Sequence, residues 1–319
     1  MRRVMIALAL FLCGVQAPAF ADAYPNHPII LIVPFAAGSG TDSVARVIAR
    51  RLSEVLKADI VIDNRAGANG AIGAAAAARA APDGYTLFSG GTSTQAANPS
   101  LLKSIQYDPA NDFAPIAQLG TFPYFLFVYP GTPAKDVREL VALAKAKPGS
   151  VSFAYGNALG RLAGEMLKKR TGADLLAVPY KSSPQGITDL ITGRVTIMFC
   201  DMPPAVAQLK DGRLRALATT TADRSALFPE YPSMKEAGVD LFDLTAWTGL
   251  FAPRGTAPEI IAKLSAAAHD VLGDAETRER LANVGFEAKW YAPEEFAKRA
   301  SDDLELWATL TREAGIERQ

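Results

Sequence analysis

The chain has 319 residues, with 33 lysines and arginines against 33 aspartates and glutamates, so its formal net charge is zero at pH 7. This balance provides no positive field for nucleic acid or another polyanion. The length is close to that at which one hydrophobic core stops growing, and we therefore expect two domains rather than one.

The first 21 residues have the pattern of an export signal. Met1-Arg2-Arg3 is basic, residues 4–13 are apolar, and Ala19-Phe20-Ala21 matches a cleavage site. The apolar run is shorter than the roughly 20 residues that span a bilayer. We predict a signal peptide at 1–21 and a mature periplasmic protein that begins at Asp22.

Cysteine and histidine are scarce. Cys13 could instead carry a lipid anchor, but the residue before it is not small, as it usually is in lipoproteins. Cleavage at the predicted site leaves only Cys200, so no intramolecular disulfide can form. The two histidines, His27 and His269, are far apart in the chain. We therefore expect no metal site and no Cys/His catalytic centre.

From Ile29 onward, short β-branched or aromatic segments alternate with segments of helical period, a pattern typical of an α/β fold with largely parallel sheets. The predicted strands are 29–34, 60–63, 85–89, 114–119, 125–129, 151–154, 175–179, 196–200, 214–219 and 247–252. The predicted helices are 42–56, 71–80, 134–146, 162–170, 184–191, 203–209, 258–272 and 293–314.

Two strand-rich segments punctuated by proline, 109–133 and 241–258, are interpreted as crossings between two lobes. They make the first lobe discontinuous, with residues 22–122 plus 248–319, and leave residues 123–247 as the second lobe. The alternative is two sequential domains joined by one linker.

Three loops of small residues follow predicted strands. The first, Phe35-Ala36-Ala37-Gly38-Ser39-Gly40-Thr41-Asp42, opens directly into a helix, whose free N–H groups form an anion site. The second is Gly90-Gly91-Thr92-Ser93-Thr94, and the third runs from Tyr155 to Arg161. Ligands bind at the carboxyl ends of strands in open α/β sheets, so the three loops are expected to face one cleft. The first loop lacks the Gly-Lys-Ser/Thr of a phosphate loop, and the alternative for Thr41 or Asp42 is a simple helix cap.

Four further side chains follow predicted strands or begin helices. Arg161 could bind a carboxylate at a helix start, or it could be a solvated surface residue. Tyr180, Lys181 and Asp201 lie at strand ends directed toward the same cleft. Asp201 could bind an ammonium group or cap the helix that Pro203 opens.

The residues do not favour an enzyme. There is no G-x-S-x-G sequence, and Asp42 and Asp201 are the only candidates for a pair of catalytic carboxylates. Trp247, Trp290 and Trp307 lie in apolar segments and are interpreted as packing anchors. We predict no catalytic residues, no cofactor and no bound metal.

The ordered motifs resemble those of the tripartite tricarboxylate transporter receptors, also called Bug or TctC-type proteins. They are Tyr24-Pro25, Val33-Pro34-Phe35 with the first loop, Asp63-Asn64-Arg65-Ala66-Gly67-Ala68, Ala81-Pro82-Asp83-Gly84-Tyr85-Thr86-Leu87, Tyr107-Asp108-Pro109, Val178-Pro179-Tyr180-Lys181, Gly212-Arg213-Leu214-Arg215 and Phe251-Ala252-Pro253-Arg254. The resemblance implies a type II periplasmic-binding-protein fold, a clamp of two lobes that closes, and delivery of the solute to a permease of one large and one small subunit.

The resemblance also implies a ligand site made of all three loops. The expected ligand-binding residues are Phe35, Ala36, Gly38, Ser39, Thr41, Asp42, Gly91, Thr92, Ser93, Tyr155, Asn157, Ala158, Arg161, Tyr180 and Asp201. The third loop departs from the family pattern, because Gly160-Arg161 precedes Leu162-Ala163-Gly164-Glu165 where a Ser-His pair is usual. The ligand is therefore expected to carry a second acceptor toward Arg161, and Arg161→Ala to weaken binding by more than about 1.5 kcal/mol.

The predicted function is reception of a small di- or tricarboxylate, aromatic acid or amino acid by a monomer that contacts its permease transiently. Two rivals remain at this point. An exported hydrolase of the same size would show turnover, and a sensor or interaction protein of the same fold would act through a membrane partner.

Overall fold

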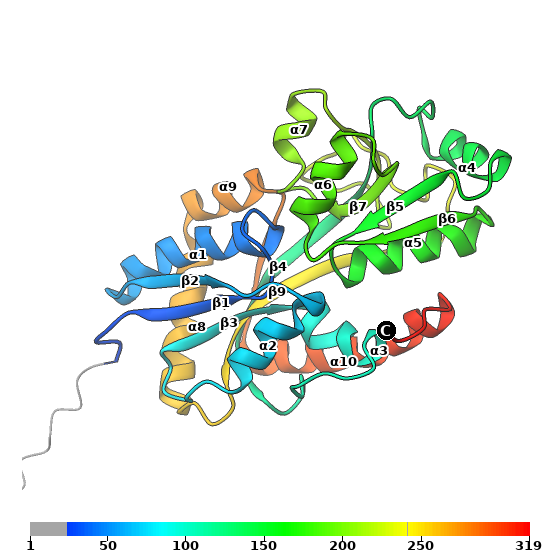
Figure 1. The fold of residues 1–319 in the computed structure, drawn as a ribbon. Helices are drawn as coiled ribbons and strands as arrows, with labels where there is room; N and C mark the ends of the chain where they lie inside the picture. The colour runs from blue at the N-terminus through cyan, green and yellow to red at the C-terminus, as the bar shows by residue number, and fades with distance from the viewer. Residues whose placement is uncertain (1–23, 241) are drawn as a thin grey trace, which may run out of the picture.

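Ten strands form the frame of the molecule in the computed structural model, which describes residues 24–240 and 242–319 (Figure 1). The predicted signal segment 1–21 and the predicted first mature residue, Asp22, lie outside the described residues. The chain forms two α/β lobes, as the alternation of strands and helices predicts.

Each lobe is built on its own part of one mixed sheet. The strands of the first lobe are β2 (Ile60–Asn64), β1 (Ile29–Val33), β3 (Thr86–Gly91), β9 (Thr245–Pro253), the first half of β4 (Phe113–Val128) and β10 (Glu287–Tyr291). Those of the second lobe are β6 (Leu175–Pro179), β5 (Val151–Tyr155), β7 (Ile197–Asp201), the second half of β4 and β8 (Arg215–Thr219). The strands β1, β2 and β3 are parallel, as are β5, β6 and β7, so their carboxyl ends lie at common sheet edges.

Helices cover both faces of each sheet (Figure 1). They are α1 (Gly40–Leu56), α2 (Ala71–Ala78), α3 (Asn98–Leu101), α4 (Val137–Ala146), α5 (Ala158–Thr171), α6 (Ser183–Ile191), α7 (Val206–Lys210), α8 (Pro258–Gly273), α9 (Ala275–Asn283) and α10 (Pro293–Glu313), with short turns η1 (Ala68–Gly70) and η2 (Ser93–Ala97). In the first lobe α1 and α8 pack on one face, while α2 and α10 pack on the other. No helix in the described ranges combines the length and apolarity needed to cross a bilayer.

The first helix begins and folds as its sequence dictates. The Ser39 side chain accepts a hydrogen bond from the Asp42 N–H at 3.3 Å, which caps the amino end. Val44, Ile48 and Leu52 form the buried stripe and pack against β1. Each such side chain stabilises the fold by about 1.5–3 kcal/mol when fully buried. This packing fixes the amino end of α1 at the junction of the lobes.

Some predicted boundaries were wrong. The segments 114–119 and 125–129 were predicted as two strands, but both belong to the single strand β4. The strand continues through Pro115 and Pro123, and its register with β9 shifts between Pro115 and Ala117. The helix predicted from 162 begins at Ala158, where the Asn157 carboxamide oxygen accepts from the Gly160 N–H at 3.0 Å. Helix α9 and strand β10 were not predicted.

Strand β4 crosses between the lobes. Its first half pairs with β9 and β10 in one lobe, and its second half pairs with β7 and β8 in the other. The second connection leads from the end of β8 back to β9, and the Thr220 hydroxyl at its start donates to the Leu244 carbonyl at its end at 2.6 Å. The boundaries at 122/123 and 247/248 remain our proposal for where one lobe ends and the other begins.

Candidate functional site

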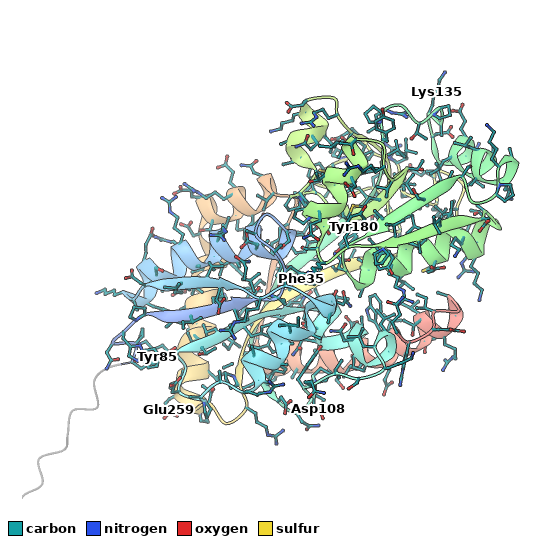
Figure 2. The ribbon with its side chains drawn as sticks, viewed as in Figure 1. Phe35, Tyr85, Asp108, Lys135, Tyr180 and Glu259 are labelled. Atoms are coloured by element: carbon teal, nitrogen blue, oxygen red, sulfur yellow. The ribbon has the colours of Figure 1, made fainter. Side chains whose placement is uncertain are left out.

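An inner cavity lies where the two lobes meet, and Figure 2 places Phe35 at this junction. In this conformation it encloses about 30 Å³. The residues that line it are Phe35, Ser39, Gly40, Thr41, Ser89, Gly91, Thr92, Ser93, Thr94, Phe122, Tyr124, Asn157, Ser182, Ser183, Asp201, Ala246 and Trp247. None of these lining residues is a lysine, arginine or histidine.

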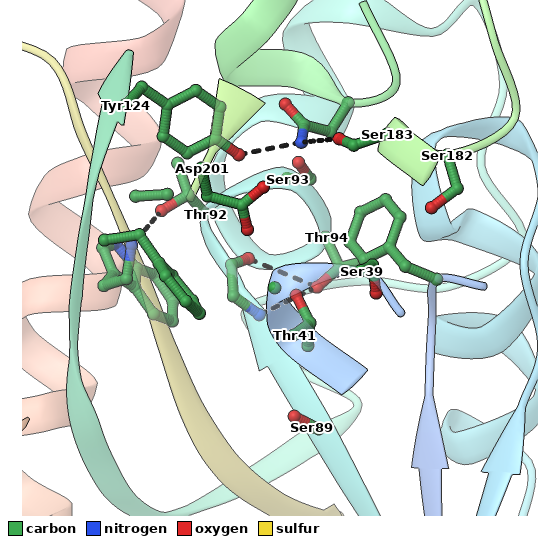
Figure 3. Close-up of a pocket in the computed structure, with 17 residues that line it drawn as sticks. Ser39, Thr41, Ser89, Thr92, Ser93, Thr94, Tyr124, Ser182, Ser183 and Asp201 are labelled. Atoms are coloured by element: carbon green, nitrogen blue, oxygen red, sulfur yellow. Dashed lines mark hydrogen bonds between the residues drawn. The ribbon is translucent and has the colours of Figure 1, made fainter. Parts of the chain in front are cut away.

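The first lobe contributes the amino end of α1 and the hydroxyl groups after β3. Free N–H groups at the start of a helix carry a partial positive charge, which favours an anion. The Thr92 hydroxyl accepts from the Trp247 N–H at 2.9 Å, and the Thr94 hydroxyl interacts with Gly91 at 3.2 Å. These contacts orient the hydroxyls around the cavity (Figure 3).

The second lobe contributes residues at the carboxyl ends of its parallel strands. The Asn157 side chain donates to the Tyr124 hydroxyl at 2.8 Å and lies 3.5 Å from the Ser183 hydroxyl. Across the cleft, the Ser93 hydroxyl accepts from the Ala158 N–H at 3.4 Å. Polar groups of both lobes therefore meet around one cavity.

Asp201 is the one carboxylate among the lining residues. It is the last residue of β7, and only 5% of it is exposed. Burial raises the pKa of Asp201 to about 7, although hydrogen bonds from its own N–H and from the Gly40 N–H act in the opposite direction. The contact with Gly40 places this second-lobe carboxylate against the amino end of α1 (Figure 3).

Asp42 is also buried, but its carboxylate is turned away from the cavity. It accepts from the Gly38 N–H, the Arg46 guanidinium and the Asn64 carboxamide, each at 2.9 Å. Burial alone would raise the pKa of Asp42, but these hydrogen bonds outweigh burial and hold the pKa below its usual value. Asp42 therefore stabilises the loop, and it does not form a pair with Asp201 across the cavity.

An outer cavity of about 290 Å³ lies beside the inner one. Its lining residues are Ala68, Asn69, Leu101, Leu102, Tyr155, Gly156, Asn157, Ala158, Arg161, Pro179, Tyr180, Lys181 and Gln319. The Arg161 guanidinium donates to the Glu317 carbonyl at 3.1 Å. The Tyr180 hydroxyl donates to Asp189 at 2.8 Å, and burial followed by that contact raises the pKa of Tyr180 to about 12. Asn157 is common to both cavities.

The structure thus divides the residues expected at the ligand site into three groups. Those that line the inner cavity are Phe35, Ser39, Thr41, Gly91, Thr92, Ser93, Asn157 and Asp201. Those that line the outer cavity are Tyr155, Asn157, Ala158, Arg161 and Tyr180. Ala36, Gly38 and Asp42 line neither cavity, and Gly38 and Asp42 bond to each other.

Sequence reasoning missed several residues of the inner cavity. The polar ones are Ser89, Tyr124, Ser182 and Ser183. Thr94, which belongs to the second predicted loop, also lines this cavity. Ser182 and Ser183 follow β6, so the strand-end argument that selected Tyr180 also applies to them. Trp247 was interpreted as a packing anchor; it packs on Phe296 and also lines the inner cavity. Within the described part of the chain, no cluster of three or more His, Cys, Asp or Glu residues is placed to hold a metal ion.

Known proteins are similar to this chain in sequence and in fold. BugT of Bordetella pertussis is 38% identical over 321 residues, which cover 99% of this chain and 98% of BugT. Among solved structures, Rpa4515 of R. palustris with adipate has a TM-score of 0.90 at 33% identity, with 93% of this chain and 100% of that chain covered. MatC of Rhodopseudomonas palustris with bound malate has a TM-score of 0.85 at 32% identity, covering 90% and 99%.

These likenesses extend over nearly the whole chain and include both lobes. The model of the tripartite tricarboxylate transporter family receptor matches residues 44–316. That range includes α1 from Val44 onward and both crossings. It also includes the lining residues of both cavities except Phe35, Ser39, Gly40, Thr41 and Gln319. The resemblance predicted from the motifs is confirmed: the chain belongs to the tripartite tricarboxylate transporter family of receptors.

Proposed function

We propose that this protein is an extracytoplasmic receptor that binds a small carboxylate in the inner cavity and delivers it to a membrane permease of two subunits. The observation that carries this proposal is the amino end of α1, which faces hydroxyl groups from both lobes in one buried cavity. Hydroxyl and backbone N–H groups are the donors that a carboxylate needs. The relatives solved with adipate and with malate support the same class of solute.

Entry of such a solute requires the lobes to part. Sites for small molecules usually have volumes of about 300–1,000 Å³, roughly ten times the inner cavity in this conformation or more. Parting the lobes at β4 and at the second connection, near Thr220 and Leu244, would open the cavity, and closure on the solute would be a hinge motion. The bound receptor then differs in shape from the open one, which is what a permease could recognise.

We further propose that the protein is exported by its signal segment 1–21, acts in the periplasm as a monomer and contacts the permease transiently. The pair of carboxylates that an exported hydrolase would use is not formed, because Asp42 bonds to Gly38, Arg46 and Asn64 instead of facing the inner cavity.

The test is the thermal stability of residues 22–319 in the presence of mono-, di- and tricarboxylates, aromatic acids and amino acids. Free ligand at 100 times its dissociation constant stabilises the folded state by about 2.7 kcal/mol, which raises the melting temperature. We expect a rise with one class of carboxylate and none with the matching diamide, which has the same length and no charge. If no carboxylate raises the melting temperature, the proposed function is wrong.

A further inference from the structure

Asp201 has an unusual position for a buried carboxylate. One oxygen lies against Gly40 at the amino end of α1, while the other, Oδ1, has no hydrogen-bond partner among the described residues. The side chain lines the inner cavity and is 95% buried, so its unpaired oxygen cannot be satisfied by bulk solvent. A buried polar atom without a partner costs free energy, which a bound solute could recover by hydrogen bonding to it.

No cation faces this carboxylate from the elements around it. Its titratable neighbours are Tyr124 on β4 and Cys200 on β7, both neutral at physiological pH because burial raises their pKa. From α1 it receives the Gly40 N–H, while the nearby Asp42 carboxylate holds the Arg46 guanidinium. The loop after β3 and the start of α6 present only hydroxyl and backbone groups, and the start of α5 presents Asn157.

A solute carboxylate in this cavity therefore meets a second carboxylate without a neutralising cation. Two carboxylates in one buried site cannot both stay ionised, and such pairs hold a proton between them. A solute ammonium group is the other way to balance the charge. It is disfavoured here, because Asp201 already lies at the positive end of α1, which repels a cation.

We propose that the bound solute and Asp201 share one proton, so that this receptor takes up a proton from solvent as it binds a carboxylate. This inference rests on the proposed function and specifies its chemistry. Asp201 accepts from the Gly40 N–H with one oxygen and donates through its protonated oxygen to the solute carboxylate. No other bond forms or breaks. A hydrogen bond of this O–H···O⁻ type is short and charge-assisted, with oxygens about 2.5–2.7 Å apart.

The sign of the pH dependence follows. Binding needs the protonated form of Asp201, and the pKa of that carboxyl in this closed conformation without solute is about 7. Affinity is therefore greatest below pH 7 and falls as the pH rises, since a proton must then be taken from solvent. Between pH 6.5 and pH 8.5, linkage gives a loss of affinity of at least about tenfold.

The experiment is calorimetric titration of residues 22–319 with adipate and with malate at several pH values. At each pH, the binding enthalpy is measured in buffers of different ionisation enthalpy, and the slope gives the number of protons taken up. We expect each binding event to take up nearly one proton at pH 8.5 and close to none at pH 6. Affinity should fall as the pH rises over this range. A proton number of zero at every pH overturns the inference while leaving the proposed function intact.

Asp201→Asn tests the residue itself. The amide can accept from the Gly40 N–H and donate to the solute without titrating, so this variant should show no proton uptake and an affinity that no longer changes with pH. The matched control is Asp303→Asn. Asp303 is a partly buried carboxyl whose pKa is also raised by burial, but it accepts from the Trp247 indole N–H and does not line the inner cavity. The control should take up the same number of protons as the wild type.

The outcomes separate the two proposals. If the wild type binds neither adipate, malate nor any other carboxylate, the proposed function fails, and this inference fails with it. If amino acids bind, if the corresponding dicarboxylates do not, and if Asp201→Asn abolishes that binding, then Asp201 pairs with an ammonium group and the shared proton is wrong. If Asp201→Asn does not fold, the proton number of the wild type still decides the question.

Discussion

The inner and outer cavities share the wall formed by Asn157 but differ in their chemistry. The inner cavity is small and lined by hydroxyls, backbone groups and one carboxyl, whereas the outer cavity is about 290 Å³ and is flanked by Arg161 and Lys181. Burying an ion is costly, while hydroxyls and helix N–H groups are neutral and keep their orientation. In the inner cavity, recognition therefore depends on the dipoles of hydroxyl and N–H groups. The cationic side chains, Arg161 and Lys181, line the outer cavity instead.

The largest effect is expected for Gly40→Ala, because Gly40 lines the inner cavity and does not line the outer one. A Cβ at this position would lie 1.5 Å from the Asp201 Oδ2 and 2.6 Å from its Cγ, so it would block the approach of the second lobe. Within the first lobe, the Cβ would also lie 3.2 Å from the Phe122 Cε1, so that ring would have to shift slightly. We expect affinity for carboxylates to fall by at least about 100-fold, the equivalent of 2.7 kcal/mol, in calorimetric titration.

Gly273→Ala is the control for this change, since a Cβ there meets no atom within 4 Å. Solution scattering adds a second readout, because Gly40→Ala should keep the larger radius of gyration of the open form when solute is added. Unchanged affinity in Gly40→Ala would show that closure onto the amino end of α1 is not needed for binding.

A smaller effect is expected for Asn157→Ala, which removes the wall between the cavities. The variant loses the bond to the Tyr124 hydroxyl and the cap of α5 together. We expect affinity to fall about tenfold and the fold to lose about 1 kcal/mol of stability from the missing cap.

Asn157→Ser separates the two losses of that variant. Serine can cap the helix but is too short to reach Tyr124, so stability in urea unfolding should recover while affinity stays low. Recovery of both quantities would mean that the contact with Tyr124 does not matter for binding.

The smallest effect is expected for Arg161→Ala with a short solute such as malate. Arg161 lines the outer cavity and is held by the Glu317 carbonyl, so a solute confined to the inner cavity does not touch it. The change in affinity should be less than about threefold, within 0.7 kcal/mol. Arg170→Ala, on the same helix but outside both cavities, is the control.

A loss above tenfold for malate in Arg161→Ala would contradict the division between the cavities. It would restore the stronger role that the sequence alone suggested for this arginine. A loss seen only with longer dicarboxylates would show that these extend past Asn157 into the outer cavity.

Much of the fold could be predicted because its signals are local. The apolar stripe of Val44, Ile48 and Leu52 predicts α1, and the β-branched run at Ile29 predicts β1 to within one residue. Strand β10 could not be predicted, because its residues are all half-buried or exposed and its pairing with β4 is distant in sequence.

The site could be predicted only in part, for a geometric reason. The strand-end rule located the loops. It did not determine the first residue of each helix, which can precede the first apolar residue of its buried stripe. Helix α5 starts at Ala158, which turns Arg161 into the outer cavity instead of leaving it in a loop at the inner one. Tyr124 was missed because it lies within the crossing strand, a position that the rule does not consider.

Strand β4 has a mechanical consequence of its own. Because 16 consecutive residues belong to the sheets of both lobes, neither lobe can twist or slide without straining backbone hydrogen bonds on the other side. The shared strand therefore leaves bending across β4 as the easiest relative motion of the two lobes, and it resists twisting and sliding. Opening and closing of the cavity therefore changes mainly one quantity, the angle between the outer faces of the lobes. A protein that touches both faces would sense occupancy without contacting the solute.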